Sequence, residues 1–302
     1  MSALVRFSLL SASWFCGTIL LAACASISPT HESEQLVRFP STDQDITKSE
    51  PTILEGTLYR PDGPGPFPAI VLMHSCAGLR DANNQPLPLF TTWAKHLRDQ
   101  GFVALLVDSY APRGLQRLCP LPERDRPIKT DRERVRDAYG ALIYLQGRRE
   151  VIANRVGAMG WSNGGQAVLW TVAAASRERP AMLPKGDFQA AISLYPGGCA
   201  QAQRVQWSTK IPFQMLIGES DDYTGAKPCA DLAATAKNSG SSVDITLFPG
   251  AHHAFDEPNR PVQIVKDVVF PDGRSPTAGT NPAARDAAFA QVPAYFRARL
   301  CR

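Results

Sequence analysis

The sequence predicts an α/β fold in which a mostly parallel, doubly wound sheet is flanked by helices within a single domain. Short and nearly continuous apolar runs, typical of strands buried on both faces, recur along the chain. Helical patterns stand between successive runs, and this alternation indicates parallel strands joined by right-handed crossovers. The chain has 302 residues, 44% of them hydrophobic, which is enough to bury a full core.

The distribution of charge argues against two classes of partner. The formal net charge is +4, but the Lys and Arg residues are scattered and form no long basic run. Binding to nucleic acid, or to a membrane surface through charge, is therefore not expected.

The first 25 residues differ from the rest of the chain and predict export. One arginine is followed by the uncharged run "FSLLSASWFCGTILLAACA", which is typical of a secretory signal peptide. "ACA" fits ordinary signal cleavage, whereas "LAAC" resembles a bacterial lipobox in which Cys24 would be lipidated. We expect a tether over 26–48, a domain over 49–302, and a place in the bacterial cell envelope, either periplasmic or membrane-anchored.

Five cysteines remain after residues 1–25 are set aside, and an oxidising compartment favours disulfides between them. No CxxC motif or Cys/His cluster indicates a metal site. The positions of the cysteines in the predicted loops favour pairing Cys76 with Cys119 and Cys199 with Cys229. Cys301 would then be unpaired.

The strands are predicted in order from these runs. Two partly alternating segments, 34–41 and 52–61, suggest an antiparallel ribbon at one edge of the sheet. The "GPGPFP" segment then breaks the chain before the first buried run. The buried runs are 69–74, 102–108, 155–161, 188–195, 213–218 and 243–249.

Helical patterns occupy the segments between these runs, at 90–101, 131–148, 163–177, 229–240 and 281–300. In the second of them Val135, Ala138, Leu142 and Leu145 share one face and the charged residues take the other, as in a helix that lies on a sheet. Residues 109–128 and 254–280 have no regular pattern. Loops of this length in a compact domain are usually functional or disordered.

Ligands of open parallel sheets bind outside the carboxyl ends of the strands, so the residues that follow each run are candidate site residues. A serine, an acid and a histidine follow separate runs in that chain order, which is the order of the α/β-hydrolase design. The residues at the run ends are His74–Cys76, Asp108, Ser162, Tyr195–Cys199, Asp221–Asp222 and His252–His253.

Ser162 stands in "GWSNGG", between a predicted strand and a predicted helix. A strained turn there would hold the hydroxyl clear of the sheet, and the neighbouring glycines would avoid collisions of Cβ atoms. The backbone N–H of Asn163 could then face a developing oxyanion. The simpler alternative is a glycine-rich turn with Ser162 as a helix N-cap.

A serine nucleophile needs a base and an orienting acid. The base would be His252 or His253, and Asp221 is favoured over Asp222 as the acid. The loop after the first buried run should supply the second oxyanion donor, with the Cys76 N–H preferred over Ser75. A structural role for the Cys76 side chain is preferred over a nucleophilic one.

The segments "VLMHSCAGL", "VDSYAPRG", "GWSNGG", "IGESDDYT" and "FPGAHHAFD" together resemble the dienelactone hydrolase family of α/β-hydrolases over about residues 50–300. The resemblance implies a triad of Ser162, Asp221 and His253, because the family histidine immediately precedes Ala-Phe. It also implies main-chain oxyanion donors at Cys76 and Asn163.

Two positions depart from the family pattern. Dienelactone hydrolases proper have a cysteine at the position of Ser162 and a glutamate at that of Ser75, which weakens the case for lactone hydrolysis through a thiolate. Trp161 before Ser162 is also similar to secreted polyester hydrolases and to prolyl-oligopeptidase-type peptidases, and this suggests Trp161 as a substrate-binding residue. The peptidases carry an additional propeller domain, for which this chain has no segment.

Arg113 lies near the position of a family arginine that grips a substrate carboxylate, and a guanidinium suits such a clamp. Alternatively, Arg113 anchors its loop through a backbone carbonyl or through Asp108, which we interpret as structural.

The sequence therefore predicts an exported, monomeric serine hydrolase that cleaves a small-molecule carboxylic ester or lactone and needs no metal or organic cofactor. A non-catalytic envelope lipoprotein that uses the fold as a binding scaffold is the alternative from another class.

Overall fold

The structure is a computed structural model that describes Met1 and residues 33–301, so the predicted signal peptide and Cys24 lie outside the described residues. Eight strands form one sheet in the order β1-β2-β4-β3-β5-β6-β7-β8. β1, β2 and β4 pair antiparallel, and every other neighbouring pair is parallel. This is the predicted mostly parallel sheet of an α/β-hydrolase fold.

Each of the eight strands overlaps a predicted segment, although β3 and β5 begin at Phe67 and Val151, before the predicted runs 69–74 and 155–161. The runs between β3 and β7 are buried on both faces, as their continuous hydrophobicity indicated. The strand bounds are β1 Glu34–Pro40, β2 Ile53–Tyr59, β3 Phe67–Met73, β4 Val103–Asp108, β5 Val151–Trp161, β6 Ala190–Leu194, β7 Phe213–Gly218 and β8 Val243–Phe248.

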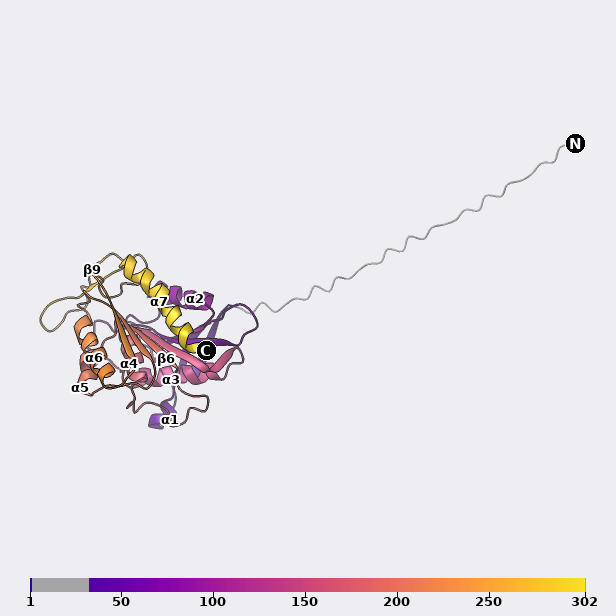
Figure 1. Cartoon of the computed structure of the whole chain (residues 1–302), viewed down its shortest axis with the longest axis horizontal. Helices are drawn as coiled ribbons and strands as arrows, with labels where there is room; N and C mark the ends of the chain where they lie inside the picture. The colour runs from indigo at the N-terminus through magenta and orange to yellow at the C-terminus, as the bar shows by residue number, and fades with distance from the viewer. Residues whose placement is uncertain (2–32, 302) are drawn as a thin grey trace. The chain divides into compact units, whose positions relative to one another are not determined.

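Helices cover both faces of the sheet (Figure 1). α2 and α7 pack together on one face, where the rings of Trp93 and Phe289 stack with centroids 3.9 Å apart. α3 and α4 pack together on the other face, and α6 lies against β7 and β8. The helix bounds are α1 Asp43–Thr47, α2 Pro88–Asp99, α3 Glu133–Gln146, α4 Asn163–Thr171, α5 Cys199–Arg204, α6 Ala226–Asn238 and α7 Pro282–Leu300.

The expected tether over 26–48 is wrong in its C-terminal part, because the folded unit begins well before residue 49. β1 pairs with β2 along its whole length, and α1 follows it. Val37 and Phe39 are buried, and the Phe39 ring stacks on Tyr144 with centroids 5.0 Å apart. Burial of these apolar side chains makes the segment part of the domain.

Short elements also escaped the sequence patterns. α4 ends at Thr171 although its helical pattern continues to 177, and α5 follows β6 without having been predicted. The unpatterned loops contain two 3-10 turns, Ala111–Arg113 and Glu123–Asp125, and a two-stranded ribbon of β9 (Gln263–Ile264) and β10 (Thr277–Ala278). No helix within 33–301 is long and apolar enough to span a bilayer.

Both predicted disulfides are confirmed, since Cys76 is bonded to Cys119 and Cys199 to Cys229. Cys301 is exposed and unpaired within the described chain. The first bridge ties the loop after β3 to the 109–128 loop, and the second ties the start of α5 to α6.

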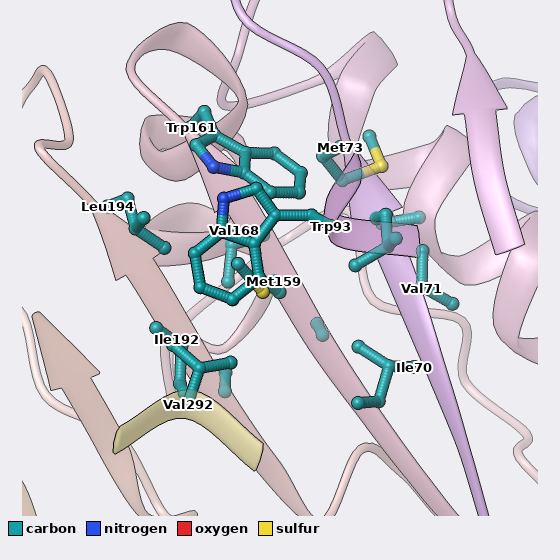
Figure 2. Close-up of a cluster of buried hydrophobic side chains, with 14 of the residues drawn as sticks. Ile70, Val71, Met73, Trp93, Met159, Trp161, Val168, Ile192, Leu194 and Val292 are labelled. Atoms are coloured by element: carbon teal, nitrogen blue, oxygen red, sulfur yellow. The ribbon is translucent and has the colours of Figure 1, made fainter. Parts of the chain in front are cut away.

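The core beneath the carboxyl ends of the strands contains two tryptophans in contact (Figure 2). Trp93 of α2 and Trp161 of β5 are both fully buried, with ring centroids 6.3 Å apart. Met73 and Leu194, from the strands on either side of β5, lie next to them. This packing fills the space directly behind the end of β5.

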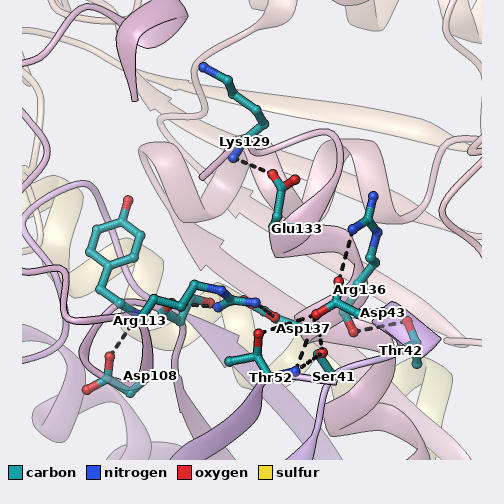
Figure 3. A network of polar contacts seen from close by, with 12 residues as sticks. Ser41, Thr42, Asp43, Thr52, Asp108, Arg113, Lys129, Glu133, Arg136 and Asp137 are labelled. Carbon is teal, nitrogen blue, oxygen red and sulfur yellow. Dashed lines mark hydrogen bonds and ion pairs between the residues drawn. The ribbon is translucent and has the colours of Figure 1, made fainter. Parts of the chain in front are cut away.

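Part of the charged face of α3 is covered by other segments of the chain (Figure 3). Asp137 accepts two hydrogen bonds from Arg113, at 2.8 and 2.9 Å, and Arg136 pairs with Asp43 at 2.9 Å. Burial alone lowers the pKa of Arg113, but the paired carboxylate of Asp137 more than offsets it and the pKa lies above its ordinary value. These pairs fasten the N-terminal segment and the 109–128 loop to α3.

We expect Asp137→Asn to lower the free energy of unfolding by about 3–5 kcal/mol, because it leaves the largely buried Arg113 cation without its partner. Urea denaturation measures the change. The exposed pair Lys227–Asp231 is a matched control, since Asp231→Asn should cost less than about 1 kcal/mol. Equal effects at the two sites would contradict this account of the buried pair.

Candidate active site

Ser162 occupies a sharp turn between β5 and α4, with φ 52° and ψ −113°. This is a left-handed backbone conformation that residues other than glycine rarely adopt. A Cβ atom at Gly164 would overlap the carbonyl oxygen of Met73 in β3, and one at Gly160 would overlap the Gly164 carbonyl. The two glycines therefore permit the close approach of strand and helix that holds the serine in this turn.

Ser162, His253 and Asp221 form a continuous chain of hydrogen bonds. The Ser162 hydroxyl lies 3.0 Å from Nε2 of His253, and Nδ1 of His253 lies 2.8 Å from Oδ2 of Asp221. With Nδ1–H donating to the carboxylate, Nε2 is free to accept the serine proton. All three residues are buried, at 4–5% exposure, and this burial shields their hydrogen bonds from competing water.

The surroundings of Asp221 favour its ionised form. The backbone N–H groups of Tyr223 and Thr224 each donate to Oδ1 at 2.9 Å. Burial by itself raises the pKa of Asp221, but attraction to His253 and these hydrogen bonds outweigh it, so the pKa lies below its usual range. Asp222 is exposed and accepts a hydrogen bond from the Thr277 N–H instead.

Of the two neighbouring histidines, the structure brings only His253 to Ser162. His252 is half-buried and has no hydrogen bond to Ser162 or Asp221 among the described residues. The Tyr223 ring stacks on His253 with centroids 4.5 Å apart, and the Tyr195 ring meets it edge-on at 4.5 Å. These two rings fix the orientation of the imidazole.

Asn163 follows Ser162 directly, Cys76 lines the same two cavities as Ser162, and neither backbone N–H donates to a protein acceptor among residues 33–301. Two free donors of this kind can stabilise the negative oxygen of a tetrahedral intermediate. Ser75 has a different contact, because its hydroxyl accepts a hydrogen bond from the Ala77 N–H at 3.2 Å.

The loop that carries Cys76 is held by His74 and by the disulfide to Cys119. Nδ1–H of His74 donates to the Ser75 carbonyl at 2.8 Å, and Nε2 accepts from the Ser109 N–H at 3.2 Å. Burial lowers the pKa of His74, and the nearby Arg134 cation adds to the effect, so this histidine is neutral and structural. Cys76 is half of a disulfide and is therefore not a thiol nucleophile.

The side chain of Asn163 has a role that no sequence pattern indicated. Its Oδ1 accepts hydrogen bonds from the Tyr110 hydroxyl at 2.9 Å and from Arg134 at 2.8 Å. Arg134 is fully buried in α3, and its guanidinium lies 5.3 Å from the centroid of the Tyr110 ring. These contacts hold the first turn of α4, and with it the Asn163 N–H, in place.

Trp161 is not a substrate-binding residue, which corrects the expectation from sequence. It is fully buried, and its indole N–H donates to Asp256 at 3.0 Å. Trp93 and the Tyr195 hydroxyl also donate to Asp256, each at 2.7 Å. Burial raises the pKa of Asp256 although the three hydrogen bonds oppose the rise. Asp256 thereby ties the segment after His253 to the strand that ends at Ser162.

Arg113 is likewise not a substrate clamp. Both of its terminal nitrogens are engaged by Asp137, and Nη1 also donates to the Ser109 carbonyl at 2.7 Å. The loop-anchoring alternative is the one observed, with Asp137 in place of Asp108. Asp108 accepts from the N–H groups of Tyr110 and Ala111, in agreement with its structural interpretation.

Two cavities adjoin Ser162, one of about 160 Å³ and one of about 520 Å³. Residues from both unpatterned loops line them, including Arg117 and Leu121 from 109–128 and Val265 and Phe270 from 254–280. These loops therefore shape the space beside Ser162. Residues 33–301 contain no cluster of three or more His, Cys, Asp or Glu side chains arranged to hold a metal ion.

Several known proteins resemble this chain in sequence or structure. The chain is 26% identical over 203 residues to a Bradyrhizobium protein named "Probable 2-oxo-3-(5-oxofuran-2-ylidene)propanoate lactonase", covering 66% of this chain and 78% of that protein. Among solved structures, a dienelactone hydrolase-like promiscuous phosphotriesterase from metagenomic libraries superposes with a TM-score of 0.61 at 18% identity, covering 88% and 99% of the chains. Esterase 2 of Thermogutta terrifontis superposes with a TM-score of 0.58 at 17% identity, covering 89% and 96%.

The two structural likenesses support the fold, and the sequence profile of the dienelactone hydrolase family matches residues 54–300, nearly the whole folded unit. The chain therefore belongs to the dienelactone hydrolase family and is a hydrolase with the α/β-hydrolase fold.

Proposed function

We propose that this protein is an exported serine hydrolase that cleaves a small-molecule carboxylic ester or lactone through an acyl-enzyme. Ser162 Oγ attacks the acyl carbon while Nε2 of His253 takes its proton. The resulting oxyanion accepts hydrogen bonds from the N–H groups of Cys76 and Asn163. His253 then protonates the leaving oxygen, and a water activated by the same imidazole releases the acid.

The observation that carries this proposal is the hydrogen-bonded chain from Ser162 through His253 to Asp221, with two free N–H donors beside the serine. A binding scaffold would have no need of a strained serine backbone, which costs about 1–3 kcal/mol. The family match supports ester or lactone hydrolysis, and the Bradyrhizobium relative is named as a lactonase.

Export is a separate part of the proposal, and it rests on residues 1–25 of the sequence. The two disulfides agree with it, because such bonds persist mainly in oxidising compartments. We further propose that Cys24 is lipidated and anchors the protein in the bacterial cell envelope.

We expect Ser162→Ala to reduce kcat/KM for ester hydrolysis by roughly 10⁵- to 10⁶-fold, because it removes the nucleophile while the fold is kept. The rates are measured with 4-nitrophenyl esters, and labelling by a fluorophosphonate probe is measured in parallel. The wild-type protein should form a stoichiometric adduct at Ser162. Undiminished hydrolysis by Ser162→Ala would falsify the mechanism.

Asp221→Asn should lower kcat by about 10⁴-fold, because an amide NH₂ cannot accept the Nδ1–H of His253 and the imidazole takes the wrong tautomer. Asp222→Asn is the matched control, since this neighbouring carboxylate is exposed and has no contact with His253 among the described residues. Steady-state kinetics compare the two variants. A similar loss in both would show that Asp221 is not the specific partner of the histidine.

Cys24→Ser should move the protein from the membrane fraction to the soluble fraction of the cell envelope, because lipidation requires the thiol of Cys24. Fractionation followed by immunoblotting measures the distribution, and metabolic labelling with a fatty acid detects the lipid. If the wild-type protein is already soluble and carries no label, the anchor is excluded and ordinary signal cleavage accounts for the segment.

A further inference from the structure

The two cavities beside Ser162, the smaller and the larger chamber, have four lining residues in common. Ser162, Cys76, Cys119 and Tyr223 line both of them. The Cys76–Cys119 disulfide packs against Val268 from the 254–280 loop, and these residues form a small buried cluster of their own. A substrate whose reacting carbon is at Ser162 can therefore extend in two directions.

Each chamber contains a different part of the catalytic machinery. His253 lines the smaller chamber and, among the described residues, does not line the larger one. Asn163 lines the larger chamber and not the smaller one. His253 and Asn163 thus face different chambers, whereas Cys76 borders both.

Proton transfer decides which half of the substrate occupies which chamber. When the bond between the acyl carbon and the leaving oxygen breaks, that oxygen takes the proton from Nε2–H of His253, so the two atoms must come within hydrogen-bond distance. The alcohol half of the substrate must therefore enter on the side of His253. The acyl half stays bonded to Ser162 and therefore occupies the chamber that Asn163 lines.

The chambers also differ in size and lining. The smaller one, of about 160 Å³, has an apolar wall made by Leu87, Leu89, Phe90 and Val265. Its charged neighbours are already paired, Arg117 with Asp267 and Arg260 with Glu257. The larger one, of about 520 Å³, is bordered by Leu121, Pro122, Phe270 and Gln166.

We propose that the smaller chamber is the alcohol subsite and the larger chamber is the acyl subsite. The preferred substrate class is then an open-chain ester with a compact apolar alcohol and a bulkier acyl group. This inference rests on the proposed function, because it takes Ser162 as the nucleophile and His253 as the proton donor.

Two tryptophan substitutions on the accessible loops test the assignment. Val265→Trp narrows the smaller chamber, and Leu121→Trp narrows the larger one. Leu121 is exposed, and Val265 is half-buried where it packs against the edge of the main core. One substrate series combines acetic acid with alcohols from methanol to octanol, and the other combines methanol with acids from acetic to octanoic. Hydrolysis is followed by pH-stat titration, and melting temperatures verify folding.

Val265→Trp should lower kcat/KM for the longer alcohols about tenfold or more relative to methyl acetate, while the dependence on acyl length stays as in the wild type. Leu121→Trp should have the reverse effect. The opposite pattern, or equal losses in both series for each variant, would overturn the assignment.

Ser162→Ala separates the two proposals. If this variant hydrolyses both series normally, the proposed function fails. If it is inactive but the tryptophan variants do not show the expected pattern, only the assignment of the subsites fails.

Discussion

β3, β5, β6 and α4 pack closely around Ser162. This packing holds the Ser162 backbone in a conformation that is unfavourable for an isolated peptide. The Ser162 N–H donates to the Leu194 carbonyl at 2.9 Å, and the Ser162 carbonyl accepts from the Gln166 N–H at 2.8 Å. These bonds and the surrounding burial offset a strain of about 1–3 kcal/mol. Because the turn is fixed from both sides, the hydroxyl meets His253 and the Asn163 N–H stays free.

Three buried carboxylates support this site in different ways. Asp137 is paired with the Arg113 cation, and Asp256 is surrounded by three neutral donors. Asp221 accepts from the histidine and from two backbone N–H groups. Burying a carboxylate without such partners would cost free energy. A carboxylate can assist acid–base chemistry when its partner is a group that takes up and releases a proton, such as a histidine. Under the proposed mechanism Asp221 therefore acts in the reaction, and the other two carboxylates stabilise the fold around it.

The two long loops acquire their role from each other. The 109–128 loop is fastened by the Cys76–Cys119 disulfide to the loop after β3, and by Arg113 to α3. The 254–280 loop follows His253 and is anchored by Asp256, and Val268 brings it against the disulfide. Residues of both loops line the two cavities beside Ser162. Under the proposed function, the contacts that fasten these loops would determine which substrates fit.

The sequence by itself determined the order of strands and helices, because continuous apolar runs and helical periodicity show within one segment which residues are buried. It also pointed to Ser162, to Asp221 and to the pair His252–His253, since the carboxyl ends of parallel strands meet at one edge of the sheet. The family resemblance then selected His253. Only the tertiary structure decided the partners of polar and aromatic side chains. Arg113 pairs with Asp137, Trp161 faces the core, and residues 34–47 join the domain, because each depends on a surface supplied by a distant segment. The residues of one segment do not indicate which distant segment will pack against it, so these partners could be identified only from the tertiary structure.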